Sequence, residues 1–525
     1  MAEQPKKRQK LPNFNIELRG DADKKAHLYA KIKKVKIYLQ KMSDGCVTNY
    51  DVFEKSLDAF LKTHDCDKKY PMPQAYVQIS KDTSENERLF VGAKCSIEKS
   101  FEIGQHHGQI CDKPLEIKKV FPLGHAVSCV AKCKDNHTYR WSSSPYIEGT
   151  GVYLVNQRML FGYWTSGMLA SQYERFAKSA NIGMLYLSRR QNNQDTFRYA
   201  VQEQFDKSIE NARFEELGLS AENSNEQQPI DILTDARHDW RRNTKDTSVV
   251  AIGQLSHKVV ACEHVTKDDC PISQKHELIG SERIVKSLEK DSIAIGVWAH
   301  DCSASINSFV RKQPEPTRNQ NETWHGVKNL KKELIKVSQG PKYKEGKTWH
   351  RQLCDKVAPV STHFQYSMRN CGGDAQNLRD RIDTIIPHYQ GDHEKCDPNS
   401  RCQTDCNYEP GHILVTDSKA ADLLKSAIAR SIIYRNPLDF ALARDTYYVE
   451  SFNNAILTFM DKRIVFSTEE YLVRSQLAVL HWNENVDREF TSKYTYRNSQ
   501  RVKKVLKRCS FQYREKLWIS YINKI

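Results

Sequence analysis

The sequence predicts a mixed α/β protein, and three observations in its middle third support that prediction. An apolar run at residues 230–233 leads into Asp235, as expected of a strand that ends in a loop. A second apolar stretch at 248–262 is interrupted by a polar break that is typical of a hairpin. An amphipathic helix at 273–290 then precedes an almost wholly apolar strand at 292–299. Strands and helices in this order indicate an α/β core.

The composition indicates a polyanionic partner. The 525 residues include 80 Lys and Arg against 65 Asp and Glu, which gives a net charge of +15. An excess of this size favours nucleic acid, with an anionic membrane surface as the alternative. No run of about 18 apolar residues occurs, so we expect no membrane-spanning segment. The amino-terminal residues lack the apolar stretch of a secretory signal. The 15 cysteines are therefore expected to be reduced thiols or metal ligands.

Shifts in composition and periodicity divide the chain into predicted segments. They are a basic tail at 1–44, a β-rich module at 45–145, a helical region at 146–224, the first part of the core at 225–310, a helical insertion at 311–440, the last part of the core at 441–490, and a basic tail at 491–525. The first tail holds a basic cluster typical of a nuclear localisation signal or of a plain solvated tail. That cluster is Lys6, Lys7, Arg8 and Lys10.

The β-rich module carries a candidate zinc site. Cys129, Cys133 and His137 have a spacing near that of zinc-finger ligands, and Cys95 or Cys111 could complete a tetrahedral set. The alternative is that the cysteines pack as small hydrophobic side chains on a strand. The helical region after this module breaks at Gly183. Its pattern is typical of a DNA-binding helix-turn-helix or of an ordinary αα-hairpin.

Two further acids extend the pattern that begins at Asp235. Asp301 comes directly after the strand at 292–299. Glu450 lies beside the narrow apolar stripe of a predicted helix, with Asn453 one turn later. Taken alone, each acid is equally typical of a surface turn or an exposed helix position. Together they follow the order strand-Asp, hairpin, helix, strand-Asp, helical insertion and helix-Glu, which is the order of an RNase H-like nuclease core.

Such a core has a defined chemistry. Three carboxylates from sequence-distant elements meet at one end of the sheet and hold two divalent cations about 4 Å apart. Mg²⁺, or Mn²⁺ in its place, is the expected ion because carboxylate oxygens suit hard cations. Asp235 would bridge both ions, and Asp301 and Glu450 would each hold one. The sequence contains no motif of a serine hydrolase, a P-loop NTPase or a zinc protease.

The helical insertion contains a second candidate zinc site. Asp374 and Asp417 are expected to cap helices on either side of it. The loop between these helices is polar and contains five soft or borderline ligands close together, a spacing that permits a zinc clip. The alternative is a solvated loop with reduced thiols. The ligands are His388, His393, Cys396, Cys402 and Cys406.

From about Cys129 to Val486 the chain contains a series of short motifs. They are Cys133-x3-His137-x3-Trp141-Ser142 with Pro145, Asp235-x-Arg237, Asp301, Trp324-His325 with Lys328-Asn329-Leu330, Cys371-Gly372-Gly373-Asp374 leading to His388, Glu450 with Asn453-Asn454, Lys462-Arg463-Ile464 with Phe466-Ser467, and Leu477-Ala478-Val479-Leu480 with Asn483-Glu484-Asn485. By the order and separation of these motifs, rather than by any one of them, the chain resembles the Kolobok superfamily of eukaryotic cut-and-paste DDE transposases.

The resemblance implies a triad of Asp235, Asp301 and Glu450 and a set of side chains near the DNA. Those DNA-binding candidates are Arg237, His238, Arg241, His325, Lys328, Lys462 and Arg463. The chain departs from the family pattern in three places. Ala236 replaces the usual Gly, the acid pair before Trp324 is Asn321-Glu322, and no THAP-type zinc finger precedes residue 129. These departures concern recognition of the transposon ends more than the chemistry.

The expected function is therefore DNA strand cleavage and strand transfer at transposon ends. The expected partners are double-stranded DNA, both transposon ends and target, and a second copy of the chain, because two ends must be cut together. The expected location is the nucleus. One alternative is a domesticated DNA-binding protein that keeps the fold but is catalytically silent. Another is a structure-specific nuclease such as a resolvase, which fits the acids but not the flanking motifs.

Overall fold

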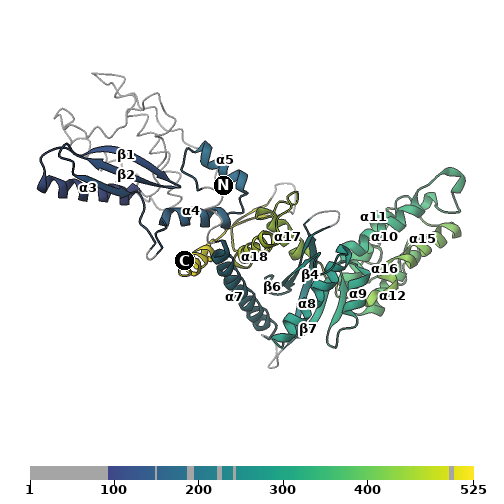
Figure 1. Cartoon of the computed structure of the whole chain (residues 1–525). Helices are drawn as coiled ribbons and strands as arrows, with labels where there is room; N and C mark the ends of the chain where they lie inside the picture. The colour runs from purple at the N-terminus through teal and green to yellow at the C-terminus, as the bar shows by residue number, and fades with distance from the viewer. Residues whose placement is uncertain (1–92, 148–149, 186–193, 222–227, 240–243, 496–501) are drawn as a thin grey trace, which may run out of the picture. The chain divides into compact units, whose positions relative to one another are not determined.

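A computed structural model describes residues 93–147, 150–185, 194–221, 228–239, 244–495 and 502–525 (Figure 1). All of these residues belong to one compact unit, Glu87–Ile525. The candidate nuclear localisation signal and the β-type runs expected before residue 92 lie outside the described residues. None of the helices in the described part of the chain has the length and apolar character needed to cross a membrane.

The amino-terminal part of the described chain is a helix against a small antiparallel sheet. Helix α3 (Ala93–Ile110) precedes β1 (Glu116–Leu123), β2 (Ala126–Lys132) and β3 (Thr138–Ser142), which pair in the order β1-β2-β3. The helices α4 (Leu154–Thr165) and α5 (Ala170–Ser179) follow, and then the long α7 (Gln194–Ala221). DNA binding by this helical region stays a prediction.

The centre of the fold is a five-stranded sheet in the order β6-β5-β4-β7-β8. Strands β4 (Ile230–His238), β5 (Asp246–Gly253) and β6 (Val259–Thr266) form antiparallel pairs, whereas β7 (Ile295–His300) and β8 (Arg318–Asn321) continue parallel to β4. A short 3-10 turn (Ser273–Lys275), α8 (His276–Lys290) and α9 (Ala304–Val310) complete this part. The layout confirms the predicted α/β class and RNase H-like arrangement, although β8 was not predicted.

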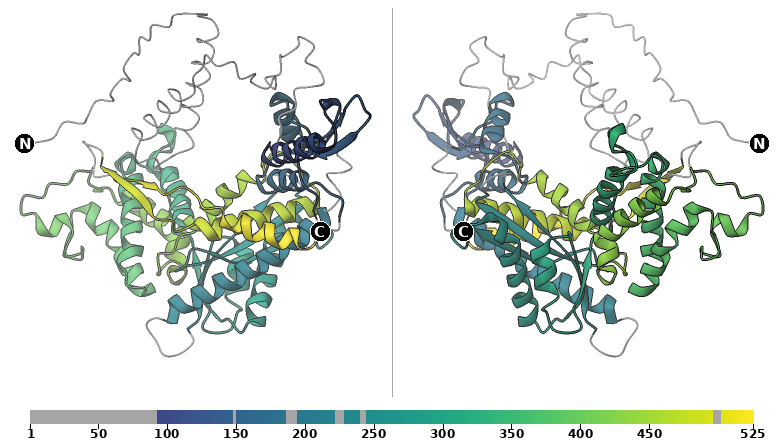
Figure 2. Two further views of the ribbon diagram at one scale, coloured as in Figure 1. Left: turned by 90° about the vertical axis from the view of Figure 1, so that its left-hand side faces the viewer. Right: turned by 90° about the vertical axis from the view of Figure 1, so that its right-hand side faces the viewer.

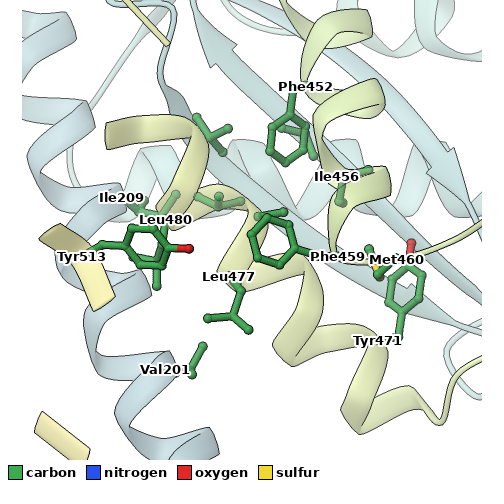
Figure 3. Packing of buried hydrophobic residues seen from close by; sticks show 14 of the residues in the cluster. Val201, Ile209, Phe452, Ile456, Phe459, Met460, Tyr471, Leu477, Leu480 and Tyr513 are labelled. Atoms are coloured by element: carbon green, nitrogen blue, oxygen red, sulfur yellow. The ribbon is translucent and has the colours of Figure 1, made fainter. Parts of the chain in front are cut away.

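Alternate residues of the strands face opposite sides of this sheet. Leu233 and Ala299 point to one hydrophobic cluster, which the sheet forms with α7, α17 (Tyr447–Ala455) and α18 (Thr468–Asn485). Phe452 of α17 and Ile456 of the turn that follows it are fully buried in this cluster (Figure 3). The strand neighbours of Leu233 and Ala299, Ile232 and Trp298, point to the opposite cluster with α8 and α9. Both faces of the sheet are therefore covered.

The residues between β8 and α17 fold around a helical core of their own. The two predicted caps are confirmed, because the carboxylate of Asp374 accepts hydrogen bonds from the backbone of Gln376 and Asn377, and that of Asp417 from the backbone of Lys419. The helices are α10 (Thr323–Ser338), α11 (Val357–Asn370), α12 (Ala375–Asp383), α13 (Ile385–Gln390), α14 (Arg401–Thr404), α15 (Ser418–Arg430) and α16 (Ile432–Arg435). Short 3-10 turns span Lys342–Lys344, Arg351–Leu353, Pro437–Asp439 and Ile456–Thr458.

The carboxy-terminal segment contributes to the main core. Strands β9 (Phe490–Thr495) and β10 (Val502–Leu506) form a hairpin, and α19 (Gln512–Ile522) packs against α7 and α18 (Figure 2). Tyr513, Leu517 and Tyr521 of α19 are buried in the same cluster as Phe452. Tyr513 is only 5 % exposed, so its ring belongs to the core and not to the surface of the predicted basic tail.

Candidate active site

The two predicted strand acids lie side by side because of the register between β4 and β7. These strands are parallel, and Leu233 pairs with Ala299. Asp235 and Asp301 each follow two residues later, so both continue the face that Leu233 and Ala299 present to α17. Neighbouring strands are about 4.8 Å apart. The alternation of the strands therefore places two carboxylates next to each other at one end of the sheet.

Asp235 is held by two hydrogen bonds and has a strongly perturbed pKa. Its Oδ1 accepts from the backbone N–H of Ala236 at 2.8 Å, and its Oδ2 accepts from the Asn453 side chain at 2.8 Å. Both bonds favour the ionised form, but burial and then the negative charge of Asp301 outweigh them and raise the pKa of Asp235 to about 7. The carboxylate is thus fixed in place and is costly to ionise without a nearby cation.

The third predicted acid, Glu450, is brought to the same region by packing of α17. Val449 and Phe452 of this helix are fully buried against the sheet, while Glu450 stays exposed at the edge of the buried face. Burial and then the negative charges of Glu322 and Asp301 raise the pKa of Glu450. The structure therefore brings Glu450 within electrostatic reach of Asp301.

Two more acids join the group, and the sequence did not indicate either of them as part of the site. Glu322 follows β8, is only 4 % exposed, and donates its backbone N–H to the carbonyl of His300 at 2.9 Å. Glu277 lies in the first turn of α8, and burial followed by the charge of Asp301 raises its pKa to about 7. The one usable signal was the spacing of Glu322 and His325, which places both on one face of a helix.

His325 links two of these acids. Its Nδ1 lies 3.4 Å from Oδ1 of Asp301 and also contacts the carboxylate of Glu322. Ligand atoms of these three residues lie within 4.8 Å of one another, a spacing that can hold a metal ion. Beside them, the fully buried amide of Asn321 has no hydrogen-bond partner for either its nitrogen or its oxygen within the described part of the chain.

The donor set fits a hard divalent cation. Oxygen ligands predominate, and burial followed by neighbouring negative charges raises the pKa of Asp235, Glu277 and Glu450. Perturbation of this kind is typical of functional sites. A cation at this end of the sheet would remove the repulsion and return the carboxylates to their ionised forms.

The predicted DNA contacts fall into three groups. Arg237 is 7 % exposed, and its guanidinium donates to the carbonyls of Asn453 at 2.7 Å and Met460 at 3.3 Å, so it ties α17 to the sheet instead of facing solvent. His238 is half-buried with Nδ1 2.9 Å from the Thr247 hydroxyl. The exposed candidates are Lys328, Lys462 and Arg463, and Arg241 lies outside the described residues.

A cavity of about 320 Å³ adjoins the acids. Glu322 and Glu450 line it together with Trp324 and Tyr447, which are 52 % and 63 % exposed. The Lys328 ammonium lies 4.5 Å from the centre of the Trp324 ring. A larger cavity of about 700 Å³ lies between α7 and β6, but none of the acids described above lines it.

Two groups of His and Cys side chains can hold a metal in the described part of the chain. One contains His388, His393, Cys396 and Cys402, with the two Nδ1 atoms 3.1 Å apart and the Cys396 sulfur 3.4 Å from that of His388. Cys406, predicted as a fifth ligand, lies outside the group and is exposed. The other group is His107, Cys111, Cys133 and His137. Cys129 is not a member, which corrects the predicted set.

Comparison with known protein families bears on this arrangement. Residues 96–283 match the family model of Mutator-like transposases. This match supports a transposase role for the chain. The transposase match begins in α3 and ends in α8, so it includes Asp235 and Glu277 but not Asp301 or Glu450. Among curated proteins, none matches the chain.

Proposed function

We propose that the protein is a DDE transposase of the Kolobok superfamily that cleaves DNA at transposon ends and transfers the freed strands. The observation that carries the proposal is the gathering of Asp235, Asp301 and Glu450 at one end of an RNase H-like sheet, where burial and then neighbouring negative charges raise the pKa of Asp235 and Glu450. The Mutator-like match supports a transposase in general, and the ordered motifs of the sequence favour Kolobok within that class.

Mg²⁺ or Mn²⁺ is the proposed cofactor, and Asp235, Asp301 and Glu450 are its proposed ligands. Bound there, divalent cations would neutralise the charge that develops on the transferring phosphate. The chain's own residues keep the ligands in place. Asn453 and the backbone of Ala236 orient the Asp235 carboxylate. Arg237 holds the helix that carries Glu450 through its bond to the Asn453 carbonyl.

The proposed reaction has two balanced steps. In the first, a water oxygen attacks a phosphorus at the transposon end, the bond to the 3′ oxygen breaks, and the products are a 3′-hydroxyl and a 5′-phosphate. In the second, that 3′-hydroxyl attacks a phosphorus in the target DNA, one phosphodiester forms as another breaks, and a new 3′-hydroxyl is released. No covalent intermediate with the protein is formed, so the chain needs no nucleophilic side chain.

The partners follow from charge and from the reaction. A net charge of +15 suits double-stranded DNA, and the exposed Lys328, Lys462 and Arg463 are the proposed phosphate contacts. We further propose that the protein acts in the nucleus as a homodimer or higher oligomer on DNA, because two ends are cut together. A structural Zn²⁺ is proposed for the group of His388, His393, Cys396 and Cys402.

A cleavage assay tests the catalytic proposal. Purified full-length chain with Mg²⁺ or Mn²⁺ is incubated with DNA that carries the sequences flanking its gene, and nicked and joined products are resolved on gels. Asp235→Asn, Asp301→Asn and Glu450→Gln are each expected to lower the rate by about 100-fold or more. The matched control Glu469→Gln changes an acid that is 67 % exposed and paired with Arg198. It should cleave at the wild-type rate.

The same assay separates the proposal from a catalytically silent DNA-binding protein. That alternative predicts salt-sensitive DNA binding by the wild-type chain and by Asp235→Asn alike, with no cleavage by either. Cleavage that survives Asp235→Asn would remove this residue from the site. Absence of any cleavage by a wild-type chain that binds the DNA would favour the silent protein.

A further inference from the structure

The His/Cys group beside the small amino-terminal sheet is assembled from two local motifs of opposite order. His107 and Cys111 are four residues apart at the end of α3, where the backbone N–H of Cys111 donates to the carbonyl of His107 at 2.9 Å. A helical spacing of four places both side chains on one face. Cys133 and His137 are also four residues apart, but in the turn that joins β2 to β3.

The turn brings its two ligands together by its backbone conformation. The N–H of Cys133 donates to the carbonyl of His137 at 3.1 Å, and Asn136 adopts a left-handed φ of 67°. Such a three-residue loop with a left-handed last residue reverses the chain within a hairpin. The Cys133 sulfur consequently lies 3.5 Å from Nδ1 of His137. A tetrahedral zinc with two sulfur and two nitrogen ligands requires ligand separations of about 3.3–3.8 Å.

The side chain of His107 gives an independent indication that a metal ion binds here. The side chain is 3 % exposed, and its Nε2 is buried without a hydrogen-bond partner in the described part of the chain. A buried imidazole nitrogen left unpaired is unfavourable. The ring is fixed by edge contacts with His137 and Tyr139, whose ring centres are 5.6 Å and 5.7 Å away. One ligand atom from each of the four residues lies within 4.8 Å of the others.

The packing of α3 shows what a metal would do there. Among the described side chains of α3, His107 is buried and Ile103 half-buried, while Phe101 and Ile110 are 69 % and 56 % exposed. Over residues 99–110, where its side chains are described, the helix therefore lacks an apolar face large enough to hold it on the sheet. Strand β1 is exposed along almost its whole length as well. Small modules with so little core are commonly stabilised by a structural metal.

We propose that His107, Cys111, Cys133 and His137 form a structural Zn²⁺ site that fastens α3 to the β2–β3 hairpin. Two thiolates and two neutral imidazoles are the ligand set that zinc favours over hard cations. Binding releases the thiol protons, and the two thiolates balance the charge of the ion. The site is independent of the proposed catalytic acids, because it uses none of them.

Zinc content of site variants tests the assignment. Full-length protein is purified, passed over a chelating resin, and its zinc measured by mass spectrometry. His107→Ala and Cys133→Ser are each expected to lose about one zinc per chain relative to wild type. Two matched controls should lose none: His106→Ala changes an exposed neighbour, and Cys129→Ala removes the predicted thiol that lies outside the group.

A thiol-protection measurement on the unmutated chain covers the case in which a variant fails to fold. N-ethylmaleimide should label Cys111 about tenfold faster after 1,10-phenanthroline removes zinc. The exposed Cys354 should react at one rate throughout. The proposal would be overturned if the labelling rate of Cys111 were the same with and without the chelator, or if His107→Ala kept the zinc content of the wild type. Loss of zinc from Cys129→Ala alone would restore the set expected from spacing.

Discussion

Replacing Asp235 by Asn should stabilise the metal-free protein at high pH and not at low pH. Burial and the charge of Asp301 raise the pKa of Asp235 from its ordinary 3.8 to about 7 in the folded chain. The folded state therefore binds more protons than the unfolded state between these two values. Stability contributed by the protonated carboxyl is complete below pH 4 and is lost as the pH rises through 7. The neutral amide of the Asp235→Asn variant has no such charge to acquire.

The size of the effect follows from the shift and from the two hydrogen bonds. A rise of about three pH units, at about 1.4 kcal/mol each, corresponds to about 4 kcal/mol. The amide can accept from only one of the two donors that now point at the carboxylate, Ala236 N–H or the Asn453 side chain, which costs about 1 kcal/mol. The expected gain is about 3 kcal/mol at pH 8 and less than about 1 kcal/mol at pH 5, because pH 5 lies only about 1.2 units above the unfolded pKa of 3.8.

Urea unfolding of magnesium-free protein at pH 5 and pH 8 measures this difference. Glu469→Gln, at an exposed position, serves as the control and should show the same free energy of unfolding as wild type at both pH values. Added Mg²⁺ should raise the stability of the wild-type chain and leave that of Asp235→Asn almost unchanged. A loss of stability of equal size at both pH values would refute the reasoning, since it would mean that Asp235 is an ordinary ionised acid.

Two further predictions concern the helix that carries Glu450. Arg237→Ala should lower the free energy of unfolding by about 3 kcal/mol, because two backbone carbonyls lose a buried charged donor. The control Arg463→Ala, at an exposed position, should change the free energy of unfolding little. Chemical denaturation compares the two variants. Phe452→Ala should cost about 3–5 kcal/mol as a core truncation, against less than about 1 kcal/mol for Leu457→Ala, which is 42 % exposed. Equal effects within either pair, by calorimetry or denaturant titration, would argue against the packing described for α17.

The proposed catalytic acids could be predicted largely because strand periodicity is local. An apolar strand that leads into an acid can be recognised from adjacent residues, so Asp235 and Asp301 could each be linked to a strand before their neighbours were known. That the two acids share one face depends on the register between β4 and β7. Glu450 was found in the same way, from its position beside an apolar stripe of helix. The caps at Asp374 and Asp417 were also predictable, since a cap depends on a few adjacent residues.

The proposed zinc ligands were harder to predict because ligand sets combine distant segments. Cys129 and Cys133 are four positions apart, which is about 13 Å along an extended strand and too far for one ion. Strand β2 ends at Lys132, and the following turn pairs Cys133 with His137 instead. His107 had no sequence signal of its own beyond its spacing to Cys111. Its place beside the hairpin depends on how α3 docks.

The sequence by itself determined the class of fold and the apolar strands that lead to Asp235 and Asp301, because these depend on the period of two or 3.6 residues along a single segment. It did not determine the end of β4, which continues to His238 instead of ending before Asp235. Tertiary structure alone decided which other groups share the site. Strand β8 has the polar sequence Arg-Asn-Gln-Asn and forms only because β7 offers it an edge. That pairing delivers Glu322 and His325 to Asp301. Long-range packing also buried Arg237, which local sequence could not show because burial depends on what lies opposite.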